Sequence, residues 1–111
     1  MLPTRYYSKR QEKQVAKVVD GKTTSNSGAS NFCAGDVIGS DNTLYECKTV
    51  TKQVKSYSIK KEVLDKIQQE AFAMKKSNAV MTFNFEPDGE LFFVLRQKHY
   101  EELLELIQNK L

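Results

Sequence analysis

The chain has 111 residues, 40% of them hydrophobic and 28% charged, and a formal net charge of +3. This length and composition predict one globular domain over residues 1–111 with a core of its own. The longest apolar run, residues 91–95, is too short to cross a bilayer, and the first residues lack the apolar stretch of a signal peptide. Two cysteines, Cys33 and Cys47, and one histidine argue against a zinc site. We therefore expect a reduced, cytoplasmic protein without membrane contact.

The charges are distributed unevenly along the chain. Residues 1–61 carry eleven Lys and Arg against five Asp and Glu, whereas residues 62–111 carry six against nine. Residues 47–61 contain five lysines and no acid. Such a one-sided positive field favours a polyanionic partner, most often nucleic acid. A solvated lysine-rich surface explains the charge equally well.

Residues 9–19 are predicted to form the first helix, with Ser8 as N-cap and Gln11 as its capping-box partner. The apolar residues of this segment form one stripe: Val15, Ala16, Val18 and Val19. Glu12 borders that stripe, so its carboxylate needs a partner or a metal ion. The alternative is an exposed Glu12 paired with a neighbouring basic side chain.

Two β-prone runs follow. Residues 22–30 predict a short strand and then a small polar loop. Residues 36–49 predict a β-hairpin, because turn-forming residues 39–42 separate Val37-Ile38 from a longer run. Folding this hairpin about its turn places Asp36 opposite Glu46, and Lys48 shares their face of the sheet.

The second half predicts a helix, a hairpin and a helix. Ser58 is expected to cap a helix that extends to about residue 76, with one buried face: Ile59, Val63, Leu64, Ile67, Ala71 and Met74. Residues 79–85 and 91–96 are expected to pair across a turn at residues 87–89, and residues 98–111 to form an amphipathic helix. We expect His99 at the surface or in a capping role, and Cys47 and the aromatic residues Phe83, Phe85, Phe92 and Phe93 in the core or packing against it. The order is helix, three strands, helix, two strands, helix, which predicts an α/β fold with a mixed sheet flanked by helices.

Four side chains near the first hairpin suggest chemistry. The carboxylates of Glu12, Asp36 and Glu46 are hard oxygen ligands that suit Mg²⁺ or Mn²⁺. Such an ion lowers the pKa of a bound water molecule and neutralises charge that develops on a phosphate. Lys48, two residues after Glu46, would orient the attacking water or stabilise the transition state. These parts suffice for phosphodiester hydrolysis, although E-x-K alone is a weak signal.

The arrangement resembles the PD-(D/E)xK nuclease superfamily, and within it the archaeal and phage-type Holliday-junction resolvases. The resemblance extends over residues 11–71 and consists of short pieces in order: E-K-Q-V-A-K (12–17), N-S-G-A-S (26–30), G-D-V (35–37), E-C-K (46–48), S-I-K-K-E (58–62) and Q-E-A (69–71). The chain departs from the superfamily's name in one respect, because Gly35 and not proline precedes Asp36.

The resemblance implies a restriction-endonuclease-like fold and a metal-dependent DNA endonuclease, with Asp36 and Glu46 as metal ligands. It implies that Lys48 is the catalytic lysine, that Glu12 completes the metal shell, and that a loop serine contributes, either Ser27 or Ser30. It also implies branched or duplex DNA as substrate, a homodimer with two active sites, and a phage, mobile-element or prokaryotic origin. We expect four lysines near the site to contact DNA phosphates: Lys52, Lys55, Lys60 and Lys61.

Three other functions stay open. A nicking, flap or restriction-like nuclease would use the same fold and the same acidic residues on another DNA. A catalytically silent DNA-binding or assembly module would keep the fold alone. A small interaction protein would use its exposed aromatic residues, and the acidic hairpin would be incidental.

Overall fold

The computed structural model describes residues 2–24 and 36–110. Its elements follow the predicted order of helix, three strands, helix, two strands and helix. They are α1 (Thr4–Val18), β1 (Lys22–Thr23), β2 (Val37–Ile38), β3 (Thr43–Lys48), α2 (Lys61–Ala73), β4 (Asn78–Phe83), β5 (Phe92–Val94) and α3 (Gln97–Asn109). None of the helices in the described part of the chain is long and apolar enough to cross a membrane.

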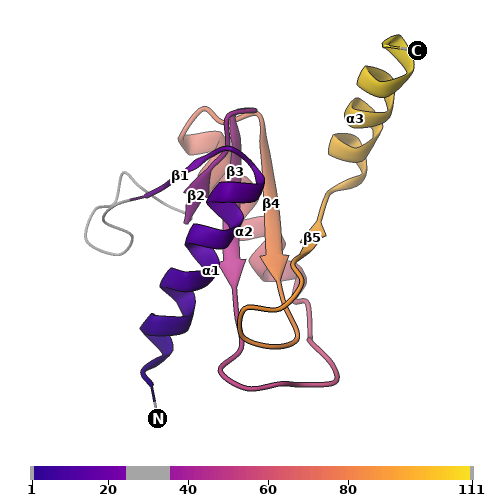
Figure 1. Ribbon diagram of the computed structural model, residues 1–111. Coiled ribbons are helices and arrows are strands. Elements are labelled where there is room, and N and C mark those ends of the chain that lie inside the picture. The colour runs from indigo at the N-terminus through magenta and orange to yellow at the C-terminus, as the bar shows by residue number, and fades with distance from the viewer. Residues whose placement is uncertain (1, 25–35, 111) are drawn as a thin grey trace.

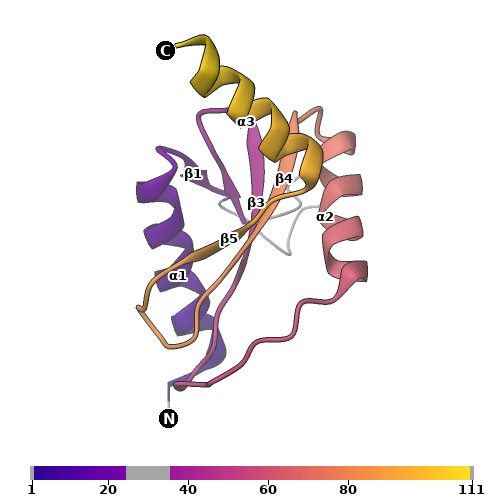
Figure 2. The ribbon, with the colours of Figure 1, turned by 90° about the vertical axis from the view of Figure 1, so that its right-hand side faces the viewer.

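The five strands form one mixed sheet in the order β1-β2-β3-β4-β5. β3 and β4 are parallel, and the other neighbouring pairs are antiparallel. Parallel neighbours need a crossover connection, which here contains α2. Figures 1 and 2 show α1 on one face of the sheet and α2 on the other. The predicted α/β architecture is therefore confirmed.

α1 and α2 each cover an apolar core of their own, because alternate side chains of a strand point to opposite faces. The core beneath α1 has four buried members: Val15, Val37, Tyr45 and Val80. The core beneath α2 has six: Leu44, Ile67, Ala71, Ala79, Met81 and Phe83. β3 and β4 both contribute to the two cores, and β3 is the middle strand of the five.

The first helix begins earlier than expected, and the prediction that Ser8 is its N-cap is wrong. α1 starts at Thr4, with Pro3 in the N-cap position. Proline lacks an N–H, and the first N–H groups of a helix have no intrahelical partner, so Pro3 causes no loss of a helical hydrogen bond there. Ser8 lies inside the helix, where its hydroxyl donates to the carbonyl of Thr4 at 3.2 Å.

The second helix begins later than expected, and Ser58 does not cap it. α2 starts at Lys61, and the preceding residue has extended backbone angles. The ring of Tyr57 stacks on Phe83, with 4.8 Å between the centroids, which holds this part of the chain against the core before the helix begins. Ile59 consequently lies outside the helix with 44% of its surface exposed, so it is not part of the buried stripe.

Two helices end through the same local device. Asp20 after α1 and Lys75 after α2 have positive φ angles of 51° and 59°. In each case the next residue's N–H donates to the carbonyl five residues before it, at 2.8 Å. This left-handed closure satisfies carbonyls at the end of the helix, and it stops α2 before the predicted residue 76.

The last helix projects from the body of the molecule (Figure 1). Its apolar side chains are largely exposed: Tyr100 by 54%, Leu104 by 38%, Leu106 by 56% and Ile107 by 57%. His99 is the exception, because it is only 5% exposed. The expectation of a surface histidine is therefore wrong, since the first turn of α3 packs against the body while the remainder does not.

Candidate active site on strands β2 and β3

The hairpin brings Asp36 and Glu46 together as expected. Val37 pairs with Tyr45, so the next position of the ladder sets Asp36 opposite Glu46. The N–H of Asp36 donates to the carbonyl of Tyr45 at 3.0 Å, and the N–H of Cys47 donates to the Asp36 carboxylate at 2.8 Å. Asp36 is thus fixed against β3 by both its backbone and its side chain.

Glu46 lies in an environment that disfavours its charge. Burial, and then the negative charge of Asp36, raise the pKa of the Glu46 carboxyl to about 7. The positive charge of Lys48 opposes this shift. One carboxylate oxygen of Glu46, Oε2, is buried without a hydrogen-bond partner. A buried acceptor without a partner is costly, and in a native structure it indicates a place where a cation, a proton or a water molecule binds.

Asp36 and Glu12 show the same tendency. Burial raises the pKa of Asp36, while the Cys47 N–H and Lys48 act in the opposite direction. Glu12 is half-buried on α1, and burial and then the charge of Asp36 raise its pKa. The negative charge of Asp36 therefore acts on both Glu12 and Glu46 and raises the pKa of each.

Lys48 follows Glu46 on the same face of β3 and is half-buried. Its backbone carbonyl accepts a hydrogen bond of 2.6 Å from the side-chain amide of Gln11. Gln11 is buried at 2% exposure, so it ties α1 to the end of β3 and does not serve as a capping partner for Ser8. The sequence contained a signal for the burial of Gln11, because Gln11 lies four residues before Val15 and therefore on the same side of the helix.

Two residues of α2 were not expected at the site. The charges of Glu70 and Lys66 reach Glu46, where Glu70 raises the pKa and Lys66 lowers it. They are four residues apart and therefore share a side of the helix. Only the packing of α2 against β3 brings them to Glu46, so no spacing in the sequence linked them to the hairpin.

The acids at the site suit a hard cation, but as they stand they do not form a complete cage. Within the described residues, no three His, Cys, Asp or Glu side chains are gathered closely enough to hold a metal ion. Mg²⁺ is usually bound by one or two carboxylates together with water and phosphate oxygens. The pair Asp36 and Glu46, with the unpartnered Oε2 of Glu46, fits that mode.

The expected DNA contacts fall into three groups. Lys52 and Lys55 are exposed in the segment between β3 and α2, and Lys60 is exposed just before α2. Lys61 is exposed as well, but it forms an ion pair of 2.8 Å with Asp65, so part of its charge is already matched. Ser27 and Ser30 lie outside the described residues.

Cys47 is half-buried on the opposite face of β3, where it packs against the core beneath α1. Burial raises the pKa of its thiol well above the ordinary value. Since the thiolate is the reactive form, this cysteine is a packing residue and not a nucleophile.

Comparisons with protein-family models, with curated protein sequences and with solved structures find no match to this chain.

The raised pKa of Glu46 predicts a pH dependence of stability. Between about pH 4.5 and pH 7 the folded protein binds more protons at Glu46 than the unfolded chain, so this residue makes stability fall as the pH rises. In metal-free buffer Glu46→Gln should therefore stabilise the protein relative to wild type by about 1–3 kcal/mol at pH 8. Denaturant unfolding of both proteins at pH 5, 6, 7 and 8 measures this difference. A difference that stays constant over that range would contradict the assignment.

Proposed function

We propose that this chain is a metal-dependent DNA endonuclease that hydrolyses phosphodiester bonds, and that its preferred substrate is a Holliday junction. The observation that carries the proposal is the half-buried pair Asp36 and Glu46, just before β2 and on β3, with Lys48 on the same face of β3 as Glu46. The junction preference rests on the resemblance to resolvases.

Asp36 and Glu46 are the residues that would hold Mg²⁺ or Mn²⁺, and Glu12 would complete the shell. The ion would supply positive charge to the scissile phosphate and acidify water. The unpartnered Oε2 of Glu46 and the raised pKa values of all three carboxyls support this assignment. A bound cation would give Oε2 a partner and would stabilise the negative charge of the carboxylates.

Lys48 is placed to assist the reaction itself. Its backbone is anchored by Gln11 and its charge reaches both Asp36 and Glu46. An ammonium held beside the scissile phosphate would orient the attacking water and stabilise the negative charge of the transition state. Because β3 lies in the middle of the sheet, the backbone that carries Lys48 is fixed before the substrate binds.

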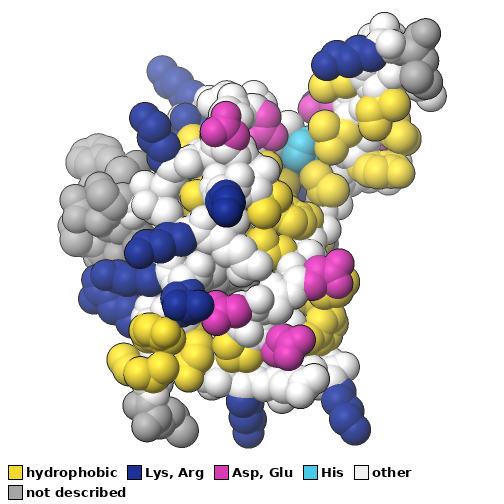
Figure 3. Space-filling view, viewed as in Figure 1, with side chains coloured by type: hydrophobic (Ala, Val, Ile, Leu, Met, Phe, Trp, Pro, Cys, Tyr) yellow, Lys and Arg dark blue, Asp and Glu magenta, His cyan; other side chains and the backbone are white. Residues whose placement is uncertain are grey.

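Basic side chains around the site are suited to DNA phosphates. Arg5 and Lys9 lie one turn apart on α1, and both act on the charge of Glu12. The exposed Lys52, Lys55 and Lys60 follow the site along the chain. Figure 3 shows Lys and Arg side chains over α1 and at the lower end of the molecule. Such contacts position a duplex without reading its sequence.

The test is cleavage of a synthetic four-way junction and a matched linear duplex, each with Mg²⁺, Mn²⁺ or EDTA. Paired, metal-dependent cuts in the junction are the expected result. Metal-dependent cleavage of other DNA instead would move the assignment to a nicking, flap or restriction-like nuclease. Failure to cut any DNA, with the protein folded, would leave a DNA-binding module or an interaction protein.

Metal binding is predicted independently of cleavage. With Mn²⁺ at about 100 times its dissociation constant, the folded state should gain about 2.7 kcal/mol, which raises the melting temperature by several degrees. Glu46→Gln should abolish most of this rise, whereas Glu62→Gln, at an exposed acid in the first turn of α2, should keep it. An equal rise in wild type and Glu46→Gln would contradict the proposed ligand set.

A further inference from the structure

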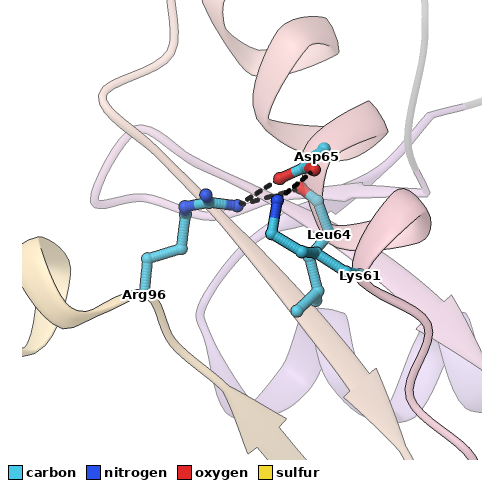
Figure 4. Close-up of polar contacts among 4 residues, drawn as sticks. All are labelled: Lys61, Leu64, Asp65 and Arg96. Atoms are coloured by element: carbon cyan, nitrogen blue, oxygen red, sulfur yellow. Dashed lines mark hydrogen bonds and ion pairs between the residues drawn. The ribbon is translucent and has the colours of Figure 1, made fainter.

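The first turn of α3 is held against α2. Arg96, the residue before the helix, donates through Nη1 to the carbonyl of Leu64 at 3.4 Å and to the carboxylate of Asp65 at 3.3 Å (Figure 4). His99, in the first turn, is only 5% exposed. The start of α3 is therefore fixed on the body of the molecule, although the rest of the helix projects from it.

A small cavity lies where α3 meets the body. It has a volume of about 150 Å³, and α2, the connection from α2 to β4, the first residue of β4 and the start of α3 form its walls. The residues that line it besides His99 are Gln68, Ser77, Asn78, Arg96, Lys98 and Glu102. Pockets for small molecules usually measure roughly 300–1,000 Å³, so this cavity suits a single small group and not a whole nucleotide.

His99 has a polar atom without a partner. Its Nδ1 is buried and makes no hydrogen bond within the part of the chain that the structure describes. A buried polar atom without a partner is costly, and in a native structure it indicates that an ion, a ligand or a water molecule binds nearby. Because His99 belongs to the wall of the cavity, the cavity is the place for such a partner.

The backbone of α3 adds hydrogen-bond donors at the same place. The first hydrogen bond of the helix runs from the N–H of Tyr100 to the carbonyl of Arg96 at 3.1 Å, and the side chain of Arg96, the N-cap residue, does not cap the helix. The N–H groups of residues 97–99 therefore precede the helical hydrogen bonds. Two of these residues, Lys98 and His99, line the cavity. Such N–H groups, at the positive end of the helix dipole, favour a bound anion.

Side chains in the wall supply further donors. Arg96 uses only Nη1 in its two hydrogen bonds, so its Nε and Nη2 have no partner among the described residues. Lys98 is exposed and forms no ion pair with any described residue. The hydroxyl of Ser77 accepts a hydrogen bond of 3.1 Å from Asn42, which leaves its own proton available for donation. A wall so rich in donors suits an oxyanion, whose oxygens are all acceptors.

Glu102 is the only acid among the described residues that line the cavity. Its carboxylate is exposed and accepts a hydrogen bond of 3.4 Å from the side-chain amide of Asn78. Water and salt screen an exposed charge, so Glu102 opposes a bound anion only weakly. Arg96 and Lys98 contribute two positive charges, of which Asp65 offsets part of the first.

We propose that this cavity binds a terminal phosphate group, either inorganic phosphate or the phosphate monoester at the end of a nucleotide or a nucleic-acid strand. The N–H groups at the start of α3 and the side chains of His99, Arg96 and Lys98 donate to its oxygens. A monoester fits better than a phosphodiester, because walls from α2, β4 and α3 leave no exit for two chains. The lining includes neither Asp36 nor Glu46, and the proposal does not rest on nuclease activity.

The single histidine of the chain makes the test direct, because imidazole signals in a proton–nitrogen NMR correlation spectrum come from His99 alone. Inorganic phosphate at constant pH should shift these signals and the backbone signals of residues 97–99, with saturation at a dissociation constant of about 1 mM. Sodium chloride at the same ionic strength should cause no saturable shift. The absence of a saturable shift up to about 50 mM phosphate would overturn the proposal.

A lysine at each end of α3 gives a matched pair of variants. Lys98→Ala should raise the dissociation constant for phosphate at least about threefold, because a charged donor to the oxyanion is lost. Lys110→Ala removes the same charge at the C-cap of α3 and should change that constant by less than about 1.5-fold, since salt screens a charge at this distance. Both lysines are exposed, so neither change should disturb the fold. Equal effects of the two substitutions would contradict a site at the start of the helix.

A short oligonucleotide identifies the source of the phosphate. A trinucleotide with a phosphate at its 5′ end should shift the same signals, whereas the trinucleotide without that phosphate, which contains only diesters, should not. Tighter binding of the phosphorylated trinucleotide than of inorganic phosphate assigns the site to a nucleic-acid end, and weaker binding assigns it to the free anion. Equal shifts with the unphosphorylated trinucleotide would overturn the assignment to a terminal phosphate. The readout needs neither metal nor cleavage, so failure here and failure of the nuclease proposal are distinguishable.

Discussion

Glu46→Gln is expected to lower the rate of DNA cleavage at least about 10³-fold while the protein becomes more stable above pH 7. The substitution keeps the shape of the side chain but removes the negative charge. Metal binding requires that charge, and burial makes it unfavourable in the metal-free protein. Opposite effects on activity and stability indicate a functional carboxylate, because substitution of a structural carboxylate would lower both the activity and the stability of the protein.

Single-turnover cleavage in Mg²⁺, together with denaturant unfolding in EDTA, measures the two effects on the same protein samples. Lys48→Ala should also reduce cleavage by about 10²–10³-fold. Lys55→Ala, at an exposed lysine outside the strands, serves as the matched control and should weaken DNA binding only slightly. If Glu46→Gln cleaves within tenfold of wild type, the carboxylate pair is not the active site.

Leu44→Ala is expected to destabilise the folded protein by about 2–5 kcal/mol. Leu44 is completely buried beneath α2 and lies on β3, two residues before Glu46. Its truncation leaves a cavity between the central strand and α2, and small domains have only about 5–15 kcal/mol of stability in total. The packing of Leu44 therefore contributes a large part of the free energy of unfolding of the domain that carries the proposed site.

Urea unfolding at pH 7 measures this change. Phe72→Ala is the matched control, because Phe72 on α2 is 83% exposed and its truncation should change stability by no more than about 0.5 kcal/mol. A loss below about 1 kcal/mol for Leu44→Ala would mean that the packing between β3 and α2 contributes little to folding.

The sequence alone predicted the element order and the pairing of Asp36 with Glu46. Both follow from local rules: a cluster of turn formers between two β-prone runs sets the register of a hairpin, and the register decides which side chains share a face. Glu12 beside the buried stripe of α1 was readable for the same reason, since helical spacing puts it next to Val15 and Ala16.

Helix boundaries were less accessible, because tertiary contacts override local capping signals. Ser8 and Ser58 both look like N-caps in the sequence. Ser8 is nonetheless inside α1, and the chain around Ser58 stays extended, because the ring of Tyr57 is held against Phe83. A capping interaction contributes only about 1 kcal/mol, which the packing of an aromatic ring readily exceeds.

The element order, the hairpin register and the proximity of two acids and a lysine were determined by the sequence, because they depend on interactions between residues close together in the chain. Only the tertiary structure decided how deeply Glu46 is buried, that Gln11 anchors Lys48, that Glu70 and Lys66 act on the site, and that the apolar side of α3 lies uncovered. The physical reason is that burial and long-range electrostatics depend on how α1, α2 and α3 pack around the sheet. An amphipathic pattern shows that a helix has an apolar side but does not show which surface covers it.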